Sequence, residues 1–135
     1  MDRINMVKQP PDPEAYIQLR REGGMSGKAI EAATIGLKHS LFCVCLYDGD
    51  TLVGMGRIIG DGATFFQIVD IVVKPSYQGQ GLAKRVMAEL MNYLDHHTYT
   101  GSYVSLMADT PADQLYKKFG FNYTSPRSVG MAKMY

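Results

Sequence analysis

The spacing of apolar positions predicts three helices of different length. Pro10-Pro11-Asp12-Pro13 opens a first helix that runs to about Arg21, because proline is tolerated in a first helical turn, and Gly23-Gly24 ends it. Ser26 is expected to cap a second helix. The apolar face of that helix would hold Ala29, Ile30, Ala33 and Leu37. The strongest helical pattern, with an apolar residue at every fourth position, runs from Leu82 to about Leu94.

Runs of apolar and β-branched residues predict strands between these helices. Leu41–Tyr47 is followed by Asp48-Gly49, a strong hairpin signal toward the run Thr51–Ile59, so these two strands should be antiparallel neighbours. A third, mostly buried strand is expected over Phe65–Val73, after the turn Gly60-Asp61-Gly62. Later strands are expected over Tyr103–Met107, Phe121–Thr124 and Val129–Met134.

A short helix is predicted between the expected strands Tyr103–Met107 and Phe121–Thr124. Thr110-Pro111-Ala112-Asp113 has the cap, the first-turn proline and the acidic residue of a helix start. Its apolar face would hold Ala112, Leu115, Tyr116 and Phe119, before Gly120. Helices and strands in this order predict one mixed α+β domain over residues 1–135, with a sheet that is antiparallel on one side and two helices before the first clear strand.

Composition narrows the class of protein further. The chain has 135 residues, of which 46% are apolar and 20% charged, so it can close a core as a single domain. Its 14 basic and 13 acidic residues leave a formal charge of +1, which gives no field for wrapping nucleic acid or coating an anionic membrane. No apolar stretch approaches the ~18 residues that span a bilayer, and the first six residues lack a signal-peptide core. We therefore expect a cytosolic protein with a small partner.

Cysteine and histidine residues give no sign of a metal centre. Cys43 and Cys45 alternate on one strand face, and no Cys or His cluster completes a set of ligands, so both are predicted to be reduced core residues. His96 and His97 end the long helix, where cations favour the helix dipole and capping is the expected role. Nothing singles out His39 as a catalytic base.

The glycine-rich segment between the third strand and the long helix carries the strongest chemical signal. A helix N-terminus normally recruits Asp or Glu, yet Lys84 and Arg85 occupy this first turn, and no carboxylate lies between Lys74 and Glu89. Glycines at positions 79 and 81 would let a ligand reach free backbone N–H groups, so a phosphate or pyrophosphate is the indicated guest. The alternative is a tight turn that needs glycine only for its geometry.

Two ordered motifs resemble a known family. Gln78-Gly79-Gln80-Gly81-Leu82-Ala83 matches the Q/R-x-x-G-x-G/A signature of the GNAT superfamily of acetyltransferases, between a strand and a helix as in that family. Leu115-Tyr116-Lys117-Lys118-Phe119-Gly120-Phe121 resembles the second signature of the family, some thirty residues later. The resemblance covers about Leu41 to Thr124. It implies a GNAT fold, in which about four helices flank a central, mostly antiparallel and splayed sheet.

The resemblance also implies a donor site for acetyl-CoA, with no metal. The pyrophosphate would meet the amides from Gly79 to Lys84. The pantetheine arm would pair with the backbone of residues 71–73 like an added strand, and an amide there would polarise the thioester carbonyl. Asp109, which stands where many relatives have Asn, would lie near the pantetheine. The implied cofactor-binding residues are Ile71, Val72, Val73, Gln78, Gly79, Gln80, Gly81, Leu82, Ala83, Lys84 and Asp109.

Two residues are catalytic candidates. An amine acceptor must lose a proton before it attacks, and Asp70 is the sole charged residue in the run from Thr64 to Val73, so it is the candidate base; the alternative is a structural pairing with Arg57 or a backbone amide. Tyr116 occupies the motif position where the family commonly has a tyrosine that protonates the departing thiolate. Its alternative is a core aromatic role.

The resemblance, together with these residues, implies an acetyl transfer from acetyl-CoA to the primary amine of a small molecule. Because neither cysteine lies in a site-like context, the amine would attack directly in a ternary complex. The acceptor pocket is expected to involve Met25, Ser26, Tyr47 and Arg57. The alternative function is a CoA-binding sensor or regulatory module without chemistry. GNAT proteins often dimerise, so the resemblance leaves a homodimer possible.

Overall fold

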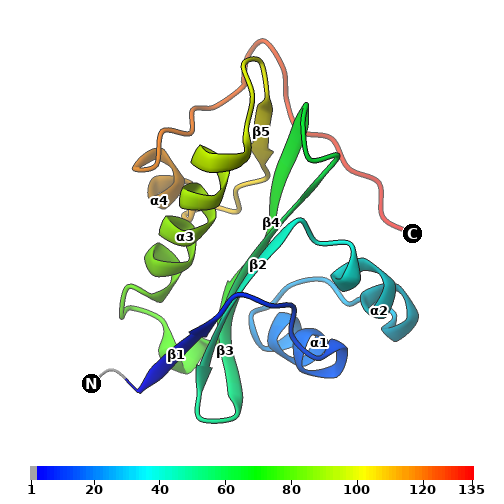
Figure 1. The fold of residues 1–135 in the computed structure, drawn as a ribbon, viewed down its shortest axis with the longest axis vertical. Helices are drawn as coiled ribbons and strands as arrows, with labels where there is room; N and C mark the ends of the chain where they lie inside the picture. Colours follow the sequence, from blue (N-terminus) through cyan, green and yellow to red (C-terminus); the bar gives the residue numbers. More distant parts are fainter. Residues whose placement is uncertain (1–2) are drawn as a thin grey trace.

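A single five-stranded sheet forms the centre of the molecule in the computed structural model, which describes residues 3–135 (Figure 1). The strand order is β1-β2-β3-β4-β5, in which β1 to β4 pair antiparallel and β5 is parallel to β4. The strands are β1 (Ile4–Val7), β2 (Phe42–Asp48), β3 (Thr51–Gly60), β4 (Phe65–Val73) and β5 (Tyr103–Leu106). The mixed, mostly antiparallel sheet that the sequence predicts is therefore present.

Helices cover both faces of this sheet. In Figure 1, α1 and α2 lie on one side of the sheet and α3 and α4 on the other. The α-helices of the described chain are α1 (Pro13–Glu22), α2 (Ile30–Lys38), α3 (Leu82–His97) and α4 (Asp113–Lys117), and a 3₁₀ turn, η1, spans Pro75–Tyr77. No helix within residues 3–135 is long and apolar enough to cross a membrane.

Two apolar layers pack against the two faces of the sheet. Because successive side chains of a strand point to opposite faces, Val44 and Leu46 of β2 pack toward α3, whereas Cys43 and Cys45 pack toward α1 and α2. Both cysteines are buried and neither forms a disulfide, as predicted. The α3 layer is completed by side chains that are fully buried, among them Val86, Met87 and Leu90.

Five local predictions are wrong. Two helices were predicted before the first strand, but β1 precedes the first helix and pairs with β2. Its four residues are too few to show the two-residue alternation of a strand. The side chain of Ser26 does not cap α2, whose N-cap is Ala29, and Thr110 does not cap α4, whose N-cap is Ala112. The predicted strands Phe121–Thr124 and Val129–Met134 are irregular, and most of their side chains are exposed, because local alternation cannot supply a hydrogen-bonded partner strand.

The sheet opens at the carboxyl end of β4. Pairing with β5 runs only from Phe65–Tyr103 to Ile68–Leu106, while β4 continues to Val73. On the β3 side, Met55 to Arg57 lies opposite Val69 to Val72, so β4 carries one extra residue, which is a β-bulge. Residues 69–73 thus have a neighbouring strand on one side only, which is the splayed geometry that the sequence predicts.

Candidate functional site

The turn from β4 to α3 leaves a helix N-terminus without a protein anion. Gly81 is the N-cap of α3, no side chain caps it, and the first turn holds no acidic residue. Gly79 and Gly81 have φ of 81° and 80°, in the left-handed region that favours glycine. A Cβ at either position would meet no atom within 4 Å, so the space beside their backbone is open. The sixteen-residue helix presents unpaired N–H groups to this space, an arrangement that suits an anion.

Hydrogen bonds of two side chains hold the start of this turn against β4 and the β2–β3 hairpin. The Gln78 amide donates to the carbonyl oxygen of Val73 at 3.0 Å, which joins the turn to the end of β4. The Tyr77 hydroxyl donates to the Asp48 carboxylate at 2.5 Å, and Arg3 donates to the same oxygen at 3.0 Å. These two hydrogen bonds, first from Tyr77 and then from Arg3, lower the pKa of Asp48. The β2–β3 hairpin therefore helps to fix where the turn begins.

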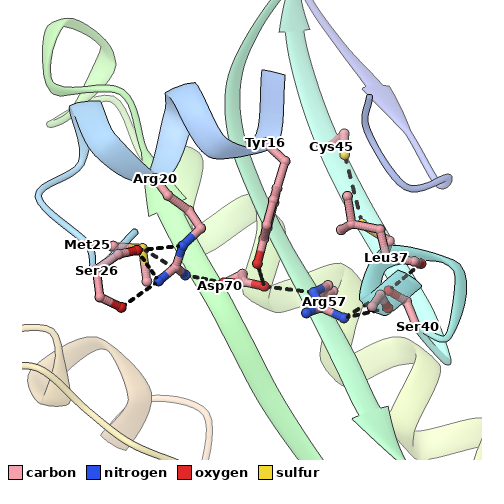
Figure 2. Close-up of polar contacts among 11 residues, drawn as sticks. Tyr16, Arg20, Met25, Ser26, Leu37, Ser40, Cys45, Arg57 and Asp70 are labelled. Carbon is pink, nitrogen blue, oxygen red and sulfur yellow. Dashed lines mark hydrogen bonds and ion pairs between the residues drawn. The ribbon is translucent and has the colours of Figure 1, made fainter. Parts of the chain in front are cut away.

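Asp70 occupies the bulge of β4 and is the one non-glycine residue of the described chain with positive φ, at 60°. It is 7% exposed. Figure 2 shows its carboxylate between side chains from α1 and β3. Oδ2 accepts from the Tyr16 hydroxyl at 2.8 Å and from Arg57 Nε at 2.7 Å, and Oδ1 forms an ion pair with Arg20. The predicted alternative, a pairing with Arg57, is therefore present.

The two arginines extend this cluster to neighbouring segments. Arg20 donates to the carbonyl oxygen of Ser26 from Nε at 3.1 Å and from Nη2 at 2.8 Å, and to its hydroxyl at 3.1 Å. Arg57 Nη1 donates to the carbonyl oxygen of Gly36 at 3.3 Å and to the Ser40 hydroxyl at 3.2 Å. We call Tyr16, Arg20, Arg57 and Asp70 the Asp70 cluster. It joins α1, the loop before α2 and the end of α2 to the bulge of β4.

Sequence reasoning missed Tyr16 and Arg20 as members of the site. A signal was present, because the two residues are four apart on α1 and so share a helix face, which is also the face that carries buried Leu19. A charged residue on a buried helix face needs a partner. The identity of that partner, fifty residues further along the chain, has no local signature.

A small pocket brings the two predicted catalytic residues together. It has a volume of about 110 Å³ and is lined by the three polar residues Asp70, Asp109 and Tyr116. Its remaining lining residues are Met25, Ile68, Val69, Ile71, Leu106, Met107 and Ala112. Burial, and then the charge of Asp109, raise the pKa of Tyr116, so its phenol is protonated at neutral pH. The pocket thus combines a protonated phenol, two carboxylates and the open end of the sheet.

Of the predicted acceptor residues, Met25 lines this pocket, and Ser26 and Arg57 lie in or against the Asp70 cluster. Tyr47 lies apart from it, on β2. A second cavity, of about 630 Å³, follows β5, α4 and the segment after it, and Tyr116 lines both cavities. Leu106 and Met107 also line both cavities, so Tyr116 is the ionisable side chain that the two share.

Histidines and metal ligands add nothing to this site. The Nδ1 atoms of His96 and His97 lie 2.8 and 2.7 Å from the carbonyl oxygens of Asn92 and Tyr93, in the last turns of α3, as expected for capping. His39 is the C-cap of α2. Within residues 3–135, no group of three or more His, Cys, Asp or Glu side chains is arranged to hold a metal ion.

Comparison with known proteins agrees with this geometry. The sequence profile of the acetyltransferase (GNAT) family matches residues 9–121. The chain is 33% identical over 108 residues to the uncharacterized N-acetyltransferase ycf52 of Porphyra purpurea, and the match covers 77% of this chain and 61% of that protein. The chain thus spans less than two thirds of the length of that relative.

Solved structures agree over the whole chain. The crystal structure of SA2161 from meticillin-resistant Staphylococcus aureus, described as a probable acetyltransferase of unknown function, superposes with a TM-score of 0.95 at 51% identity, over 98% of this chain and 99% of that one. The GNAT family protein SP0256 of Streptococcus pneumoniae gives a TM-score of 0.79 at 28% identity, over 98% of each chain. The chain therefore belongs to the GNAT family of acetyltransferases and has its α+β fold.

Proposed function

We propose that this protein transfers the acetyl group of acetyl-CoA to a primary amine of a small molecule, by direct attack in a ternary complex. The observation that carries the proposal is the juxtaposition of two features at the open end of β4. One is an uncapped helix N-terminus with open glycine backbone, at Gly79 and Gly81. The other is the pocket that Tyr116 and Asp70 share.

The residues around the turn fit acetyl-CoA. The amides from Gly79 to Lys84 would hold its pyrophosphate, because no side chain caps the start of α3 and its first turn holds no competing carboxylate. The backbone of 71–73 would pair with the pantetheine arm, because no strand of the described chain covers that edge of β4. When bound there, acetyl-CoA supplies an acetyl group activated as a thioester.

The reaction needs one proton to leave and another to arrive. The amine nitrogen must lose a proton before it forms the C–N bond, and the sulfur that leaves when the C–S bond breaks must gain one. The Tyr116 phenol is the proposed donor to sulfur, since its raised pKa keeps it protonated at neutral pH. The predicted role of Asp70 as proton acceptor stays a prediction.

A small acceptor suits the charge of the chain. The formal charge of +1 offers no field to steer a polyanion or a highly basic protein tail. Of the two carboxylates that line the site pocket, Asp70 is already paired with Arg20 and Arg57. Attraction for an amine that arrives as its ammonium form would therefore come from Asp109.

Donor binding is tested first by the thermal shift of the purified protein with acetyl-CoA. Saturation a hundredfold above the Kd adds about 2.7 kcal/mol, which raises Tm on the order of ten degrees for a domain of this size. Gly79→Asp should abolish the shift by adding a carboxylate at the pyrophosphate site. Gly101→Asp is the matched control, since Gly101 also has positive φ and open space, and should keep it. A protein that is not shifted by acetyl-CoA would refute the proposed donor.

Turnover is tested by release of the CoA thiol with a panel of amines: polyamines, aromatic amines, amino acids and a peptide N-terminus. Tyr116→Phe should lower kcat by about 10²- to 10⁴-fold and leave the Kd for acetyl-CoA unchanged, because it removes only the proton donor. Wild-type turnover in Tyr116→Phe would refute the role of Tyr116. Donor binding without acetyl transfer to any amine would favour the CoA-binding sensor instead.

A further inference from the structure

We propose that Asp70 is a positioning residue for this reaction and not its proton acceptor. In this proposal the Asp70 cluster fixes the bulge of β4, and thereby the backbone of residues 71–73, where the thioester is to be bound. The proposal rests on the proposed function for its chemistry. Its structural basis is independent, because it depends only on the contacts of Asp70.

The first argument is the occupancy of the carboxylate. Oδ2 already accepts two hydrogen bonds, from Tyr16 and Arg57, and Oδ1 is held by Arg20. The side chains of Arg20 and Asp70 are 6% and 4% exposed, and that of Arg57 is 13% exposed. A proton placed on Asp70 would leave two buried guanidinium groups without their anion, which is the costly way to break a buried ion pair. A proton acceptor needs an oxygen that is free to receive a proton from the substrate.

The second argument is the backbone conformation of Asp70. A non-glycine residue at positive φ persists only where its surroundings determine it. Here three side chains from two elements, α1 and β3, donate hydrogen bonds to the Asp70 carboxylate (Figure 2). Bulges re-aim the residues around them, so these hydrogen bonds to Asp70 also set the direction of the next peptide groups of β4. The cluster is therefore placed to orient backbone donors.

The third argument is that Arg20 connects Asp70 to the loop before α2. The guanidinium of Arg20 holds the Ser26 backbone and hydroxyl as well as Asp70. Met25, the neighbour of Ser26, lines the pocket that Tyr116 lines. One side chain thus connects the loop on the acceptor side with the bulge on the donor side. We expect damage to the cluster to impair both sides together.

The test compares Arg20→Gln with Asp70→Asn, using the best amine of the panel, and follows kcat against pH. The groups that face Asp70 are Tyr16 and Arg20 from α1, Arg57 from β3 and, more weakly, Cys43 from β2. If Asp70 is a positioning residue, Arg20→Gln and Asp70→Asn should both lose about 10²-fold in kcat at every pH, as expected for misplaced reacting groups. The double variant should lose no more than either single one.

A base role predicts a different pattern. Arg20→Gln, which keeps the carboxylate, should then retain far more of kcat than Asp70→Asn, which removes it. That result would overturn the proposal. Arg21→Gln is the matched control, since Arg21 is the exposed neighbour of Arg20 and its guanidinium donates to the exposed Gln18, and it should retain wild-type kcat.

A ligand-free measurement separates this proposal from the proposed function. Amide hydrogen exchange of residues 69–73 should rise in Asp70→Asn and Arg20→Gln by about tenfold more than exchange of Val86 and Leu90 in the core, because the bulge opens locally. In Tyr16→Phe, which keeps both ion pairs and serves if the charge variants do not fold, a smaller rise confined to the same residues is expected. Equal rises in the bulge and the core would overturn the proposal, whether or not any amine is acetylated.

Discussion

Gly23 closes α1 against the strand that carries the site, and Gly23→Ala tests this contact. A Cβ at position 23 would lie 2.3 Å from Cγ2 of Val72. Ordinary contact between carbon atoms requires ~3.5–4.0 Å, so one side must move by about 1.2 to 1.7 Å. Val72 is buried and its β-branched side chain is restricted at χ1, so it cannot turn away at low cost. Either the end of α1 or β4 must shift.

The expected cost follows from this overlap. Overpacking of a core costs about 1–3 kcal/mol, so Gly23→Ala should lower the free energy of unfolding by about 2 kcal/mol. For a domain of this size that lowers Tm by about 6 to 10 °C. The pocket should suffer as well, because the overlapping residue belongs to the backbone proposed to meet acetyl-CoA. We therefore expect a raised KM for acetyl-CoA in the same variant.

Urea unfolding of four proteins provides the assay: wild type, Gly23→Ala, Val72→Ala and the double variant. Val72→Ala removes the atom that Cβ would meet, so in that background Gly23→Ala should be neutral or stabilising by about 0.4–1 kcal/mol, as for an unstrained glycine. Gly27→Ala is the control, because a Cβ there meets nothing within 4 Å, and it should also stabilise. If Gly23→Ala costs the same in both backgrounds to within about 0.5 kcal/mol, the reasoning is refuted.

Two further predictions concern proton equilibria. Because the charge of Asp109 contributes, after burial, to the raised pKa of Tyr116, Asp109→Asn should move the basic limb of the kcat profile to lower pH; an unmoved limb would argue against Tyr116 as donor. Asp61 accepts hydrogen bonds, first from the Thr64 hydroxyl and then from backbone N–H groups, which hold its pKa in the folded protein below its unfolded value. Its stabilisation is therefore present above the unfolded pKa and lost as pH falls toward the folded one. Asp61→Asn should destabilise at pH 7, and in urea melts its difference from wild type should shrink steadily as the pH falls below the unfolded pKa; a difference that stays constant on acidification would contradict this.

Local sequence was sufficient for several elements. The four-residue period of Leu82 to Leu94 marks α3, and the apolar run Phe65–Val73 marks β4 with its observed bounds, because the period of side-chain burial is a property of the local backbone. The open turn at Gly79 and Gly81 was predictable for the same reason. The glycines at positions 79 and 81 and the absence of Asp and Glu between Lys74 and Glu89 can both be read directly from the sequence.

The tertiary structure decided what depends on distant pairing. β1 exists because β2 offers it an edge, and the segments 121–124 and 129–134 are irregular although their apolar pattern resembles that of a strand. In both cases the hydrogen-bonding partner, which a short segment does not encode, determines the outcome.

The Asp70 cluster shows the same division within the site. From the sequence, Asp70 was recognisable as a lone charge in an apolar strand, and Arg57 was one predicted partner. Only the fold brought Tyr16 and Arg20 to it, across 54 and 50 residues of chain. A buried carboxylate is stabilised by whichever donors the packing of helix on sheet places around it, and that packing depends on the whole core rather than on the residues beside the charge.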